Sequence, residues 1–366
     1  MSFRHRHYVP CLRWKLGEYQ AVLHLSSDAK EQITPLIEVP EIGFDFETRA
    51  DKKTIDEHLA PIAKRVKKKW GTEPCFVDLV LLDPAARMTD GIHPVDFVFD
   101  ALREAKCHAV PVASPERDQA YRAAVSKVAV RDGLGLCIRT SLALASESRL
   151  KAHIDSLLAE SKLRPKNCDL VLDLGAPNFV PLSGFAKLIE KVIDGMPYIK
   201  RWRTFTLLGS SFPQSMAEIK SSPEIVERQE WLLYKLVTGK LDAKGLRLPT
   251  FGDYAINHPD VFQIDMRLVK PSASIRYTVD DAWFVVKGPN VRQNGYGQYR
   301  GHCTTVLKSG FFCGTAFSAG DKYIKGCAKG TETTGNLTTW RWVGTNHHIE
   351  KVVRDVASLH DLAGSP

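Results

Sequence analysis

Four charged residues end or interrupt the most apolar runs of this 366-residue sequence. Glu38 follows PLI, Asp173 follows LVL, Asp253 follows TFG, and Arg139 follows LCI. An unpaired charge inside a buried segment costs several kcal/mol. These four side chains are therefore predicted to have a specific partner or ligand, and they are the candidate catalytic residues. Weaker candidates, which are polar residues within or after other apolar runs, are Asp78, Glu116, Ser210, Ser211 and Tyr254.

Carboxylates that converge on a cleft can perform two kinds of chemistry. They bind Mg²⁺ or Mn²⁺ for phosphoryl transfer, or they divide the roles of general acid and base as in glycosidases. Glu38, Asp173 and Asp253 are predicted as metal ligands or catalytic acids, with Arg139 stabilising negative charge. The alternative is an internal ion pair of Arg139 with Asp173 or Glu38, and both interpretations stay open.

A second group of polar residues lies near the C-terminus. Arg341, between Trp340 and Trp342, offers a cation and a stacking surface for a base or sugar. Thr345 or Asn346 is predicted as the N-cap of an amphipathic helix, whose free N–H groups can hold an anion. The alternative is a capped closing helix anchored by aromatic residues. The predicted substrate-binding residues are Asp321, Tyr323, Trp340, Arg341, Asn346 and His347.

Short apolar runs that alternate with helical patterns must position these residues. The runs lie near 33–39, 75–82, 108–113, 135–140, 169–175 and 204–210, with weaker ones near 247–254 and on both sides of Asp280. Continuous apolarity indicates parallel strands buried on both faces. About eight such units favour a (β/α)8 TIM-type barrel over a doubly wound sheet. The candidate acids would then lie at the carboxyl ends of its strands, where such barrels carry their active sites.

The composition of the chain changes after residue 288, where Gly, Asn, Thr and aromatic residues become frequent. This change predicts a barrel over 1–288 and a helical, Gly- and aromatic-rich extension over 289–366 that packs on it. A final helix is expected to bury Ile349, Val352 and Val356. The sequence has no GxGxxG or P-loop motif in the context that dinucleotide or nucleotide triphosphate binding requires.

Composition bounds the class of protein. The 44% hydrophobic and 25% charged residues are typical of a globular chain, and the net charge of +8 gives a weak preference for polyanions such as nucleic acid or nucleotides. No run of 18 apolar residues occurs, so no membrane association is expected. Eight scattered cysteines predict buried, reduced thiols and hence a cytoplasmic location.

Segments at both ends of the chain resemble a known family. The opening YVPCLRWKLGEYQAVLHL with ITPLIEVP, and the closing FSAGDKYIKGCAKG with GNLTTWRWVGTNHHI, resemble the Beta protein family of bacteria and their phages. The resemblance covers nearly the whole chain but implies no reaction and no catalytic residues. Some members occur in gene neighbourhoods suggestive of phage defence, which implies a nucleic-acid or nucleotide target.

Two classes of function follow from these observations. The first is a cytoplasmic barrel hydrolase acting on a phosphate-containing or nucleic-acid substrate, with Arg139 and Arg341 holding the phosphate and Mg²⁺ or Mn²⁺ as the metal. The second is a non-enzymatic sensor or adaptor that binds a phage or host protein component. A carbohydrate-active barrel is a third alternative. The sequence does not identify the substrate.

Overall fold

The computed structural model describes residues 2–260 and 268–362. The chain forms two compact units, and each is assembled from segments that are distant in sequence. The first unit contains the described parts of 1–14, 34–209 and 230–253, and the second those of 15–33, 210–229 and 254–366. This division differs from the predicted boundary at residue 288, because three segments before that residue belong to the second unit.

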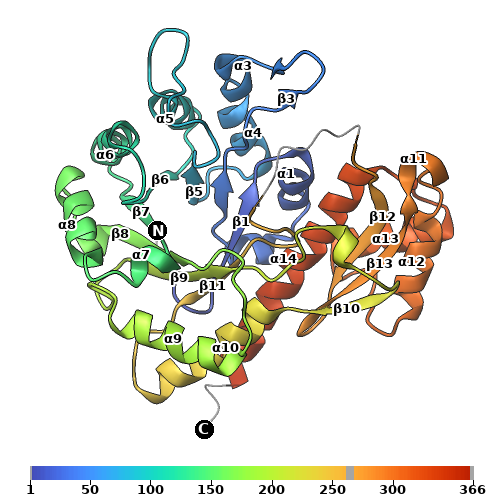
Figure 1. Cartoon of the computed structure of the whole chain (residues 1–366). Coiled ribbons are helices and arrows are strands. Elements are labelled where there is room, and N and C mark those ends of the chain that lie inside the picture. The colour runs from blue at the N-terminus through green and yellow to red at the C-terminus, as the bar shows by residue number, and fades with distance from the viewer. Residues whose placement is uncertain (1, 261–267, 363–366) are drawn as a thin grey trace. The chain divides into compact units, whose positions relative to one another are not determined.

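The first unit is a closed barrel of eight parallel strands, which confirms the predicted TIM-type architecture (Figure 1). Around the barrel the order is β1 (Tyr8–Arg13), β11 (Thr250–Asp253), β9 (Thr204–Gly209), β8 (Cys168–Asp173), β7 (Leu136–Ser141), β6 (Ala109–Ala113), β5 (Cys75–Asp78) and β2 (Leu36–Glu38). Because all strands run the same way, the residues that end them meet at one rim. We call this rim the barrel mouth.

Helices between the strands cover the outside of the barrel (Figure 1). The spacing of apolar residues in the sequence predicts their buried faces, as in the stripe Val95, Val98, Phe99 and Leu102. The helical elements of this unit are α3 (Ile55–Leu59), α4 (Ile62–Lys69), α5 (Pro94–Glu104), α6 (Gln119–Asp132), α7 (Leu142–Ala145), α8 (Leu150–Glu160), η1 (Pro165–Asn167), α9 (Leu182–Asp194) and α10 (Gln229–Ala243), and a small ribbon pairs β3 (Phe44–Asp45) with β4 (Ala50–Asp51).

Side-chain caps fix where two helices near the barrel mouth begin. The His93 side chain accepts a hydrogen bond from the Val95 N–H at the start of α5. The Asp118 carboxylate accepts one from the Tyr121 N–H at the start of α6. Such caps satisfy backbone donors that a helix leaves free at its first turn. The loops after β5 and β6 are therefore held in defined positions.

Two strand assignments differ from the sequence-based expectation. The strand β1 is not among the predicted runs, because YVPCLR is short and includes a proline and an arginine. The two runs around Asp280 were expected in the barrel, but they form the antiparallel hairpin of β12 (Ser272–Thr278) and β13 (Ala282–Asn290) in the second unit.

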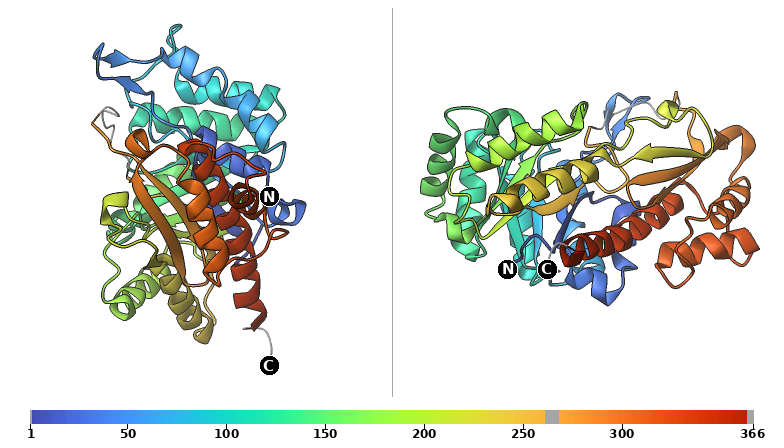
Figure 2. Two further views of the ribbon diagram at one scale, coloured as in Figure 1. Left: turned by 90° about the vertical axis from the view of Figure 1, so that its right-hand side faces the viewer. Right: turned by 90° about the horizontal axis from the view of Figure 1, so that it is seen from below.

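The second unit packs helices against a three-stranded sheet of order β10, β13, β12. Its longest helix, α14, lies along β12 (Figure 2). Its other elements are α1 (Leu16–Leu23), α2 (Ser27–Glu31), η2 (Met216–Glu218), β10 (Glu224–Glu227), α11 (Val291–Asn294), α12 (Tyr299–Lys308) and α13 (Ala319–Lys329), and α14 itself spans Leu337–Leu362. The core includes Tyr277, Tyr299 and Trp340.

All eight cysteines are free thiols. Seven are buried, as expected, whereas Cys313 is exposed. Within the described part of the chain, no helix combines the length and apolarity needed to span a bilayer. The cytoplasmic location stays a prediction.

A buried ion pair near the start of β8 holds neighbouring strands of the barrel together. Arg203 donates to both carboxylate oxygens of Asp169, at 3.0 and 2.5 Å, and to the Leu134 carbonyl at 2.9 Å. The Thr204 hydroxyl also donates to Asp169, which has no exposed surface. Removal of one partner from such a pair leaves a buried charge uncompensated.

We expect Asp169→Ala to lower the free energy of unfolding by about 3 kcal/mol, because Arg203 loses its buried counter-charge. Urea denaturation followed by far-UV circular dichroism measures this loss. Lys151→Ala, which breaks an exposed pair with Asp155, is the matched control and is expected to leave the unfolding midpoint nearly unchanged. Equal midpoints for Asp169→Ala and wild type would show that the pair does not stabilise the barrel.

Candidate functional site

Arg139 lies between three carboxylates at the barrel mouth. Its Nε donates to Asp173 at 2.9 Å, and its Nη1 donates to Glu38 and to Asp78, each at 2.9 Å. Its Nη2 is 2.7 Å from the Asp173 carboxylate. The ion pair expected as the alternative is therefore confirmed, and it includes Asp78 as a third acid. We call Arg139 with Glu38, Asp78 and Asp173 the mouth cluster.

Two further arginines extend this cluster along the rim. Arg13, at the end of β1, is 3.7 Å from Glu38, and Arg117, in the loop after β6, is 3.1 Å from Asp78. Asp78 has no exposed surface, whereas the side chains of Arg139 and Arg117 are 11% and 18% exposed. Positive and negative groups thus alternate, and the partly exposed members are the arginines and Asp173, whose side chain is 13% exposed. The fixed guanidinium donors suit an anionic ligand.

The third predicted metal ligand has a different environment. Asp253 accepts a hydrogen bond of 2.5 Å from the Tyr8 hydroxyl. Its register partner on the neighbouring strand β1 is Pro10. Among the described residues, no group of three or more His, Cys, Asp or Glu side chains is arranged to hold a metal ion. Where the prediction placed a cation, between Glu38 and Asp173, the structure has the Arg139 guanidinium. The metal site of Glu38, Asp173 and Asp253 stays a prediction.

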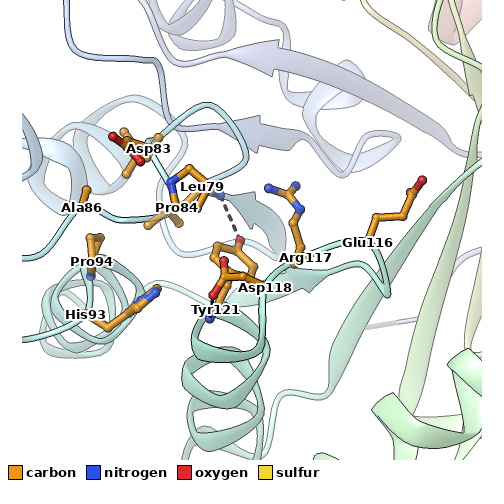
Figure 3. A pocket seen from close by; sticks show the side chains of 11 residues that line it. Leu79, Asp83, Pro84, Ala86, His93, Pro94, Glu116, Arg117, Asp118 and Tyr121 are labelled. Atoms are coloured by element: carbon orange, nitrogen blue, oxygen red, sulfur yellow. Dashed lines mark hydrogen bonds between the residues drawn. The ribbon is translucent and has the colours of Figure 1, made fainter.

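A pocket of about 410 Å³ borders the mouth cluster (Figure 3). Figure 3 shows that its side chains come from the segment after β5 and from the segment after β6, with Glu116 apart from the others. Arg117 and Tyr121 line it, and both contact the Asp78 carboxylate, so this buried acid joins pocket and cluster. The other lining residues are Leu79, Leu82, Asp83, Pro84, Ala86, His93, Pro94, Glu116 and Asp118.

His93 is a titratable residue in the wall of this pocket. Burial, together with the charge of Arg87, lowers the pKa of its imidazole, although Asp96 and Asp118 act in the opposite direction. Its Nδ1 accepts the Val95 N–H at 3.1 Å, so in the neutral ring the proton lies on Nε2. His93 can therefore offer an N–H donor to a bound molecule.

Glu116, a weaker sequence candidate, lies at the edge of the same pocket. It accepts hydrogen bonds from Ser141 at 2.9 Å and from Ser114 at 3.3 Å. These contacts connect the ends of β6 and β7, and they position a solvent-exposed carboxylate beside Arg117.

Three of the predicted substrate-binding residues in the second unit lie in its interior. Asp321, Asn346 and His347 have no exposed surface. Asp321 accepts hydrogen bonds from Tyr277 at 2.6 Å and from Ser318 at 2.5 Å, and it contacts the Nδ1 of His347 at 2.8 Å. The structure shows an interior network that ties α13 to α14 and β12, and ligand binding by these three residues stays a prediction.

The expected helix start at Thr345 or Asn346 is wrong. The helix α14 begins at Leu337, so both residues lie in its interior and leave no free N–H groups for an anion. Asn346 instead accepts from the Gly320 N–H at 2.8 Å and donates to the Ala21 carbonyl at 3.0 Å. The polar run TTWRWVGTNHH has the composition of a loop, but it is helical, and its residues Thr345, Asn346, His347 and His348 are buried.

The aromatic and basic candidates in the second unit are placed differently. The Tyr323 hydroxyl contacts Thr333 near the surface. Trp340 is buried, and its ring stacks on that of Tyr299 with 4.4 Å between the ring centroids. Trp340 and Arg341 both line a second pocket, whose other residues also belong to this unit. Arg139 and Arg341 therefore belong to different units, and their joint binding of a phosphate stays a prediction.

The model of the family described as Beta protein matches residues 8–354. The chain belongs to the Beta protein family. No curated protein matches it, so no reaction is assigned from a relative. Among solved structures the chain is similar to triosephosphate isomerase from Bartonella henselae, with 14% identity, 68% of this chain and 92% of that chain covered, and a TM-score of 0.33. That likeness is weak, and the barrel assignment rests on the strand pairing described above.

Several site residues of this Beta family member were missed or underrated from the sequence. Arg13 was missed with its strand β1, and Arg117 was not considered although it directly follows the candidate Glu116. Tyr121 and His93 lie at helix starts, where polar residues are usually interpreted as caps that hydrogen-bond the backbone. The loops that follow barrel strands are the signal that could have identified them, because those loops build the working face.

We expect Arg139→Met to lower the free energy of unfolding by about 3 kcal/mol, because three carboxylates lose their shared cation. Chemical denaturation measures the loss. The double variant Arg139→Met/Asp78→Asn is expected to be more stable than Arg139→Met, because it has one fewer buried negative charge. A single variant as stable as wild type would show that the cluster contributes nothing to the barrel.

The interior network predicts a pH-dependent stability. Burial acts to raise the pKa of Asp321, but the charge of His347 and hydrogen bonds from His347, Ser318 and Tyr277 outweigh it, so the pKa is lowered. An acid whose pKa is lowered on folding stabilises the protein above its unfolded pKa of about 3.9. This stabilisation is lost as the pH falls through the folded pKa.

We therefore expect Asp321→Asn to be less stable than wild type at neutral pH, and the difference to narrow as pH falls below about 4. Urea denaturation of both proteins across this range measures the difference. A gap that widens on acidification would contradict an ionised Asp321 in the folded protein.

Proposed function

We propose that the barrel is a hydrolase for a small phosphate-containing substrate that binds at the mouth cluster. The observation that supports this proposal is the pair of arginines that share the Asp78 carboxylate beside the pocket. Arg117 lines the pocket, and Arg139 is linked to it through the carboxylate of Asp78. Guanidinium groups held in fixed positions recognise phosphate oxygens well.

The carboxylates supply groups for proton transfer. Glu38 and Asp173 are held in place by Arg139, and the Asp173 carboxylate also accepts the Gly175 N–H at 2.8 Å. Asp173 is 13% exposed, against 4% for Glu38, so it is the acid better placed to reach a substrate or water. We assign it the acid/base role, with Glu38 positioning Arg139.

The pocket limits the size of the substrate. A volume of about 410 Å³ lies in the range of small-molecule sites. Leu79, Leu82 and Pro94 give it an apolar wall, while Arg117 and His93 provide hydrogen-bond donors. These features favour a small phosphate ester with an apolar or aromatic group over a nucleic-acid strand at this site. Mg²⁺ or Mn²⁺ as cofactor, and a role in phage defence, stay predictions.

A non-enzymatic sensor or adaptor is the second candidate. The observation in its favour is that Glu38, Asp78 and Asp173 all pair with arginines, which would stabilise the barrel without any reaction. Asp173→Asn would then leave the cellular phenotype unchanged, and a stable protein partner would be recovered with the variant as with wild type.

We expect the purified protein to hydrolyse at least one ester in a panel of aryl phosphomonoesters and phosphodiesters, assayed with Mg²⁺, with Mn²⁺ and with EDTA. Asp173→Asn is expected to lower kcat/KM by about 100-fold or more, and Arg117→Met to act mainly on KM. Asp155→Asn, an exposed acid on α8, is the matched control and is expected to keep full activity.

Unchanged turnover in folded Asp173→Asn would contradict the assigned acid/base role. The absence of turnover of every ester by wild type, in all three metal conditions, would contradict the hydrolase and favour the sensor or adaptor.

A further inference from the structure

A pocket of about 480 Å³ lies at the end of the barrel where the strands begin, opposite the barrel mouth. Its lining residues all belong to the first unit. They come from the segment before β1, from the start of β9 and the residues before it, and from the segment between α10 and β11. The volume lies in the range of small-ligand sites. We call this cavity the strand-start pocket.

Positive charge dominates the lining of the strand-start pocket. Arg4, Lys200, Arg203 and Arg247 contribute cations, and Asp242 is the one acid among the described lining residues. Arg203 is compensated by its buried pair with Asp169. Within the described part of the chain, the other three cations form no ion pair with Asp242 or with any other acid. Such an excess of positive charge in one concave site favours a multiply charged anion.

Backbone carbonyls hold Arg247 in place. Its Nη1 donates to the carbonyls of Ile199 and Trp202, at 3.0 and 2.7 Å, and its Nη2 donates to the Arg203 carbonyl at 3.4 Å. These acceptors are neutral, so they fix the guanidinium without balancing its charge. A guanidinium has five N–H donors, and the three bonds leave two of them for a ligand. A cation that is fixed in advance lowers the entropic cost of binding.

Like charges in this pocket repel one another. Burial, together with the charge of Arg4, lowers the pKa of Arg247. Burial and the charges of Arg6 and Arg4 also lower the pKa of His5, and Asp242 opposes this second shift. The guanidinium of Arg4 therefore acts on two other lining residues at once. An anion bound among these groups would relieve their repulsion.

The aromatic residues of the pocket do not offer a surface for a planar ligand. Trp202 and Phe205 line it, but only 3% and 2% of their surfaces are exposed. Phe3 stacks on His7, with 4.3 Å between the ring centroids. The pocket thus offers charge and hydrogen-bond donors, and it does not offer a ring face for a base. These features favour a compact anion over a nucleotide.

The three cations precede three neighbouring strands of the barrel. Arg4 precedes β1, Lys200 precedes β9, and Arg247 precedes β11. The order β1, β11, β9 places these strands side by side. An anion that contacts all three cations would therefore connect adjacent strands, and it would stabilise the folded barrel because it binds only when the three segments are assembled.

We propose that the strand-start pocket binds a small anion of the diphosphate type, held by Arg4, Lys200 and Arg247. Guanidinium groups bind phosphate oxygens through paired N–H donors, and lysine binds them as a point charge. A single phosphate would reach fewer of the three cations and would bind more weakly. The site is independent of the barrel mouth, and its ligand stabilises the barrel without being the substrate of the mouth cluster.

Isothermal titration calorimetry with inorganic pyrophosphate tests this assignment, with inorganic phosphate and a single-stranded oligothymidylate as comparison probes. Wild type and Arg117→Met are both titrated, so that binding at the barrel mouth is separated from binding at the strand-start pocket. Pyrophosphate is expected to bind Arg117→Met, and to bind it more tightly than phosphate does. Low salt, about 50 mM, keeps charge interactions measurable.

Three substitutions in the Arg117→Met background locate the site. Arg247→Met is expected to weaken pyrophosphate binding roughly tenfold or more, because it removes a charge-assisted contact. Arg4→Gln and Lys200→Gln, both at exposed positions where folding is not at stake, are expected to weaken it roughly threefold or more. Lys191→Gln, an exposed lysine on α9 outside the pocket, is the matched control and should bind like its parent.

Thermal unfolding of the same proteins supplies a second readout. Pyrophosphate is expected to raise the unfolding midpoint of Arg117→Met and of the Lys191→Gln control, and to raise it less after Arg4→Gln. The midpoints without pyrophosphate also establish that each variant is folded.

Pyrophosphate affinity that is unchanged in both Arg4→Gln and Lys200→Gln would overturn the proposal, as would no binding to Arg117→Met at millimolar pyrophosphate. An oligothymidylate that binds more tightly than pyrophosphate and is lost in Arg4→Gln would also overturn it, because the ligand would then be a nucleic-acid strand. Binding that wild type shows and Arg117→Met loses belongs to the barrel mouth, so a failure of either site is recognised separately.

Discussion

The sharing of one guanidinium by three carboxylates is the constraint on which the barrel mouth depends. Glu38, Asp78 and Asp173 end three different strands, and without Arg139 their charges would repel one another at the rim. Buried charges of one sign are tolerated only when a counter-charge satisfies them with good geometry. Arg139 supplies hydrogen bonds to all three, so the same contacts that close the rim also fix its shape.

This arrangement gives the rim a chemical character as well as stability. Glu38 and Asp78 are buried, while Asp173 and the arginines Arg13, Arg117 and Arg139 are partly exposed. A site built in this way presents oriented donors that need little reorganisation when an anion arrives. The cost is that the acids are already engaged, and for this reason a purely structural role is the alternative to catalysis.

The sequence predicted much of the barrel because a continuously apolar strand is stable only where helices or other strands bury both of its faces. As one of two open alternatives it also offered an ion pair of Arg139 with Asp173 or Glu38, since an isolated charge inside such a strand must be compensated. It could not predict the second unit, which collects segments around 15–33, 210–229 and 254–362 through tertiary packing alone. Nor could it place Asp253, whose contact with Tyr8 depends on the register of an unrecognised strand.

The C-terminal motifs show a further limit of sequence reasoning. Polar residues such as Asp321, Asn346 and His347 suggest ligand contacts, and in the structure all three are buried and hydrogen-bonded to other residues of the second unit. Pattern alone does not separate a polar residue that faces a ligand from one that faces another helix, because both break apolar periodicity. Arg341, in the same motif, does line a pocket.

The most direct test of a phosphate site at the barrel mouth is the binding of phenyl phosphate, measured by calorimetry. We predict binding by this protein and roughly tenfold weaker binding after Arg117→Met is added, because Arg117 joins the pocket to the mouth cluster. Equal affinity with and without Arg117, or no binding at millimolar phenyl phosphate, would contradict a phosphate site at the mouth.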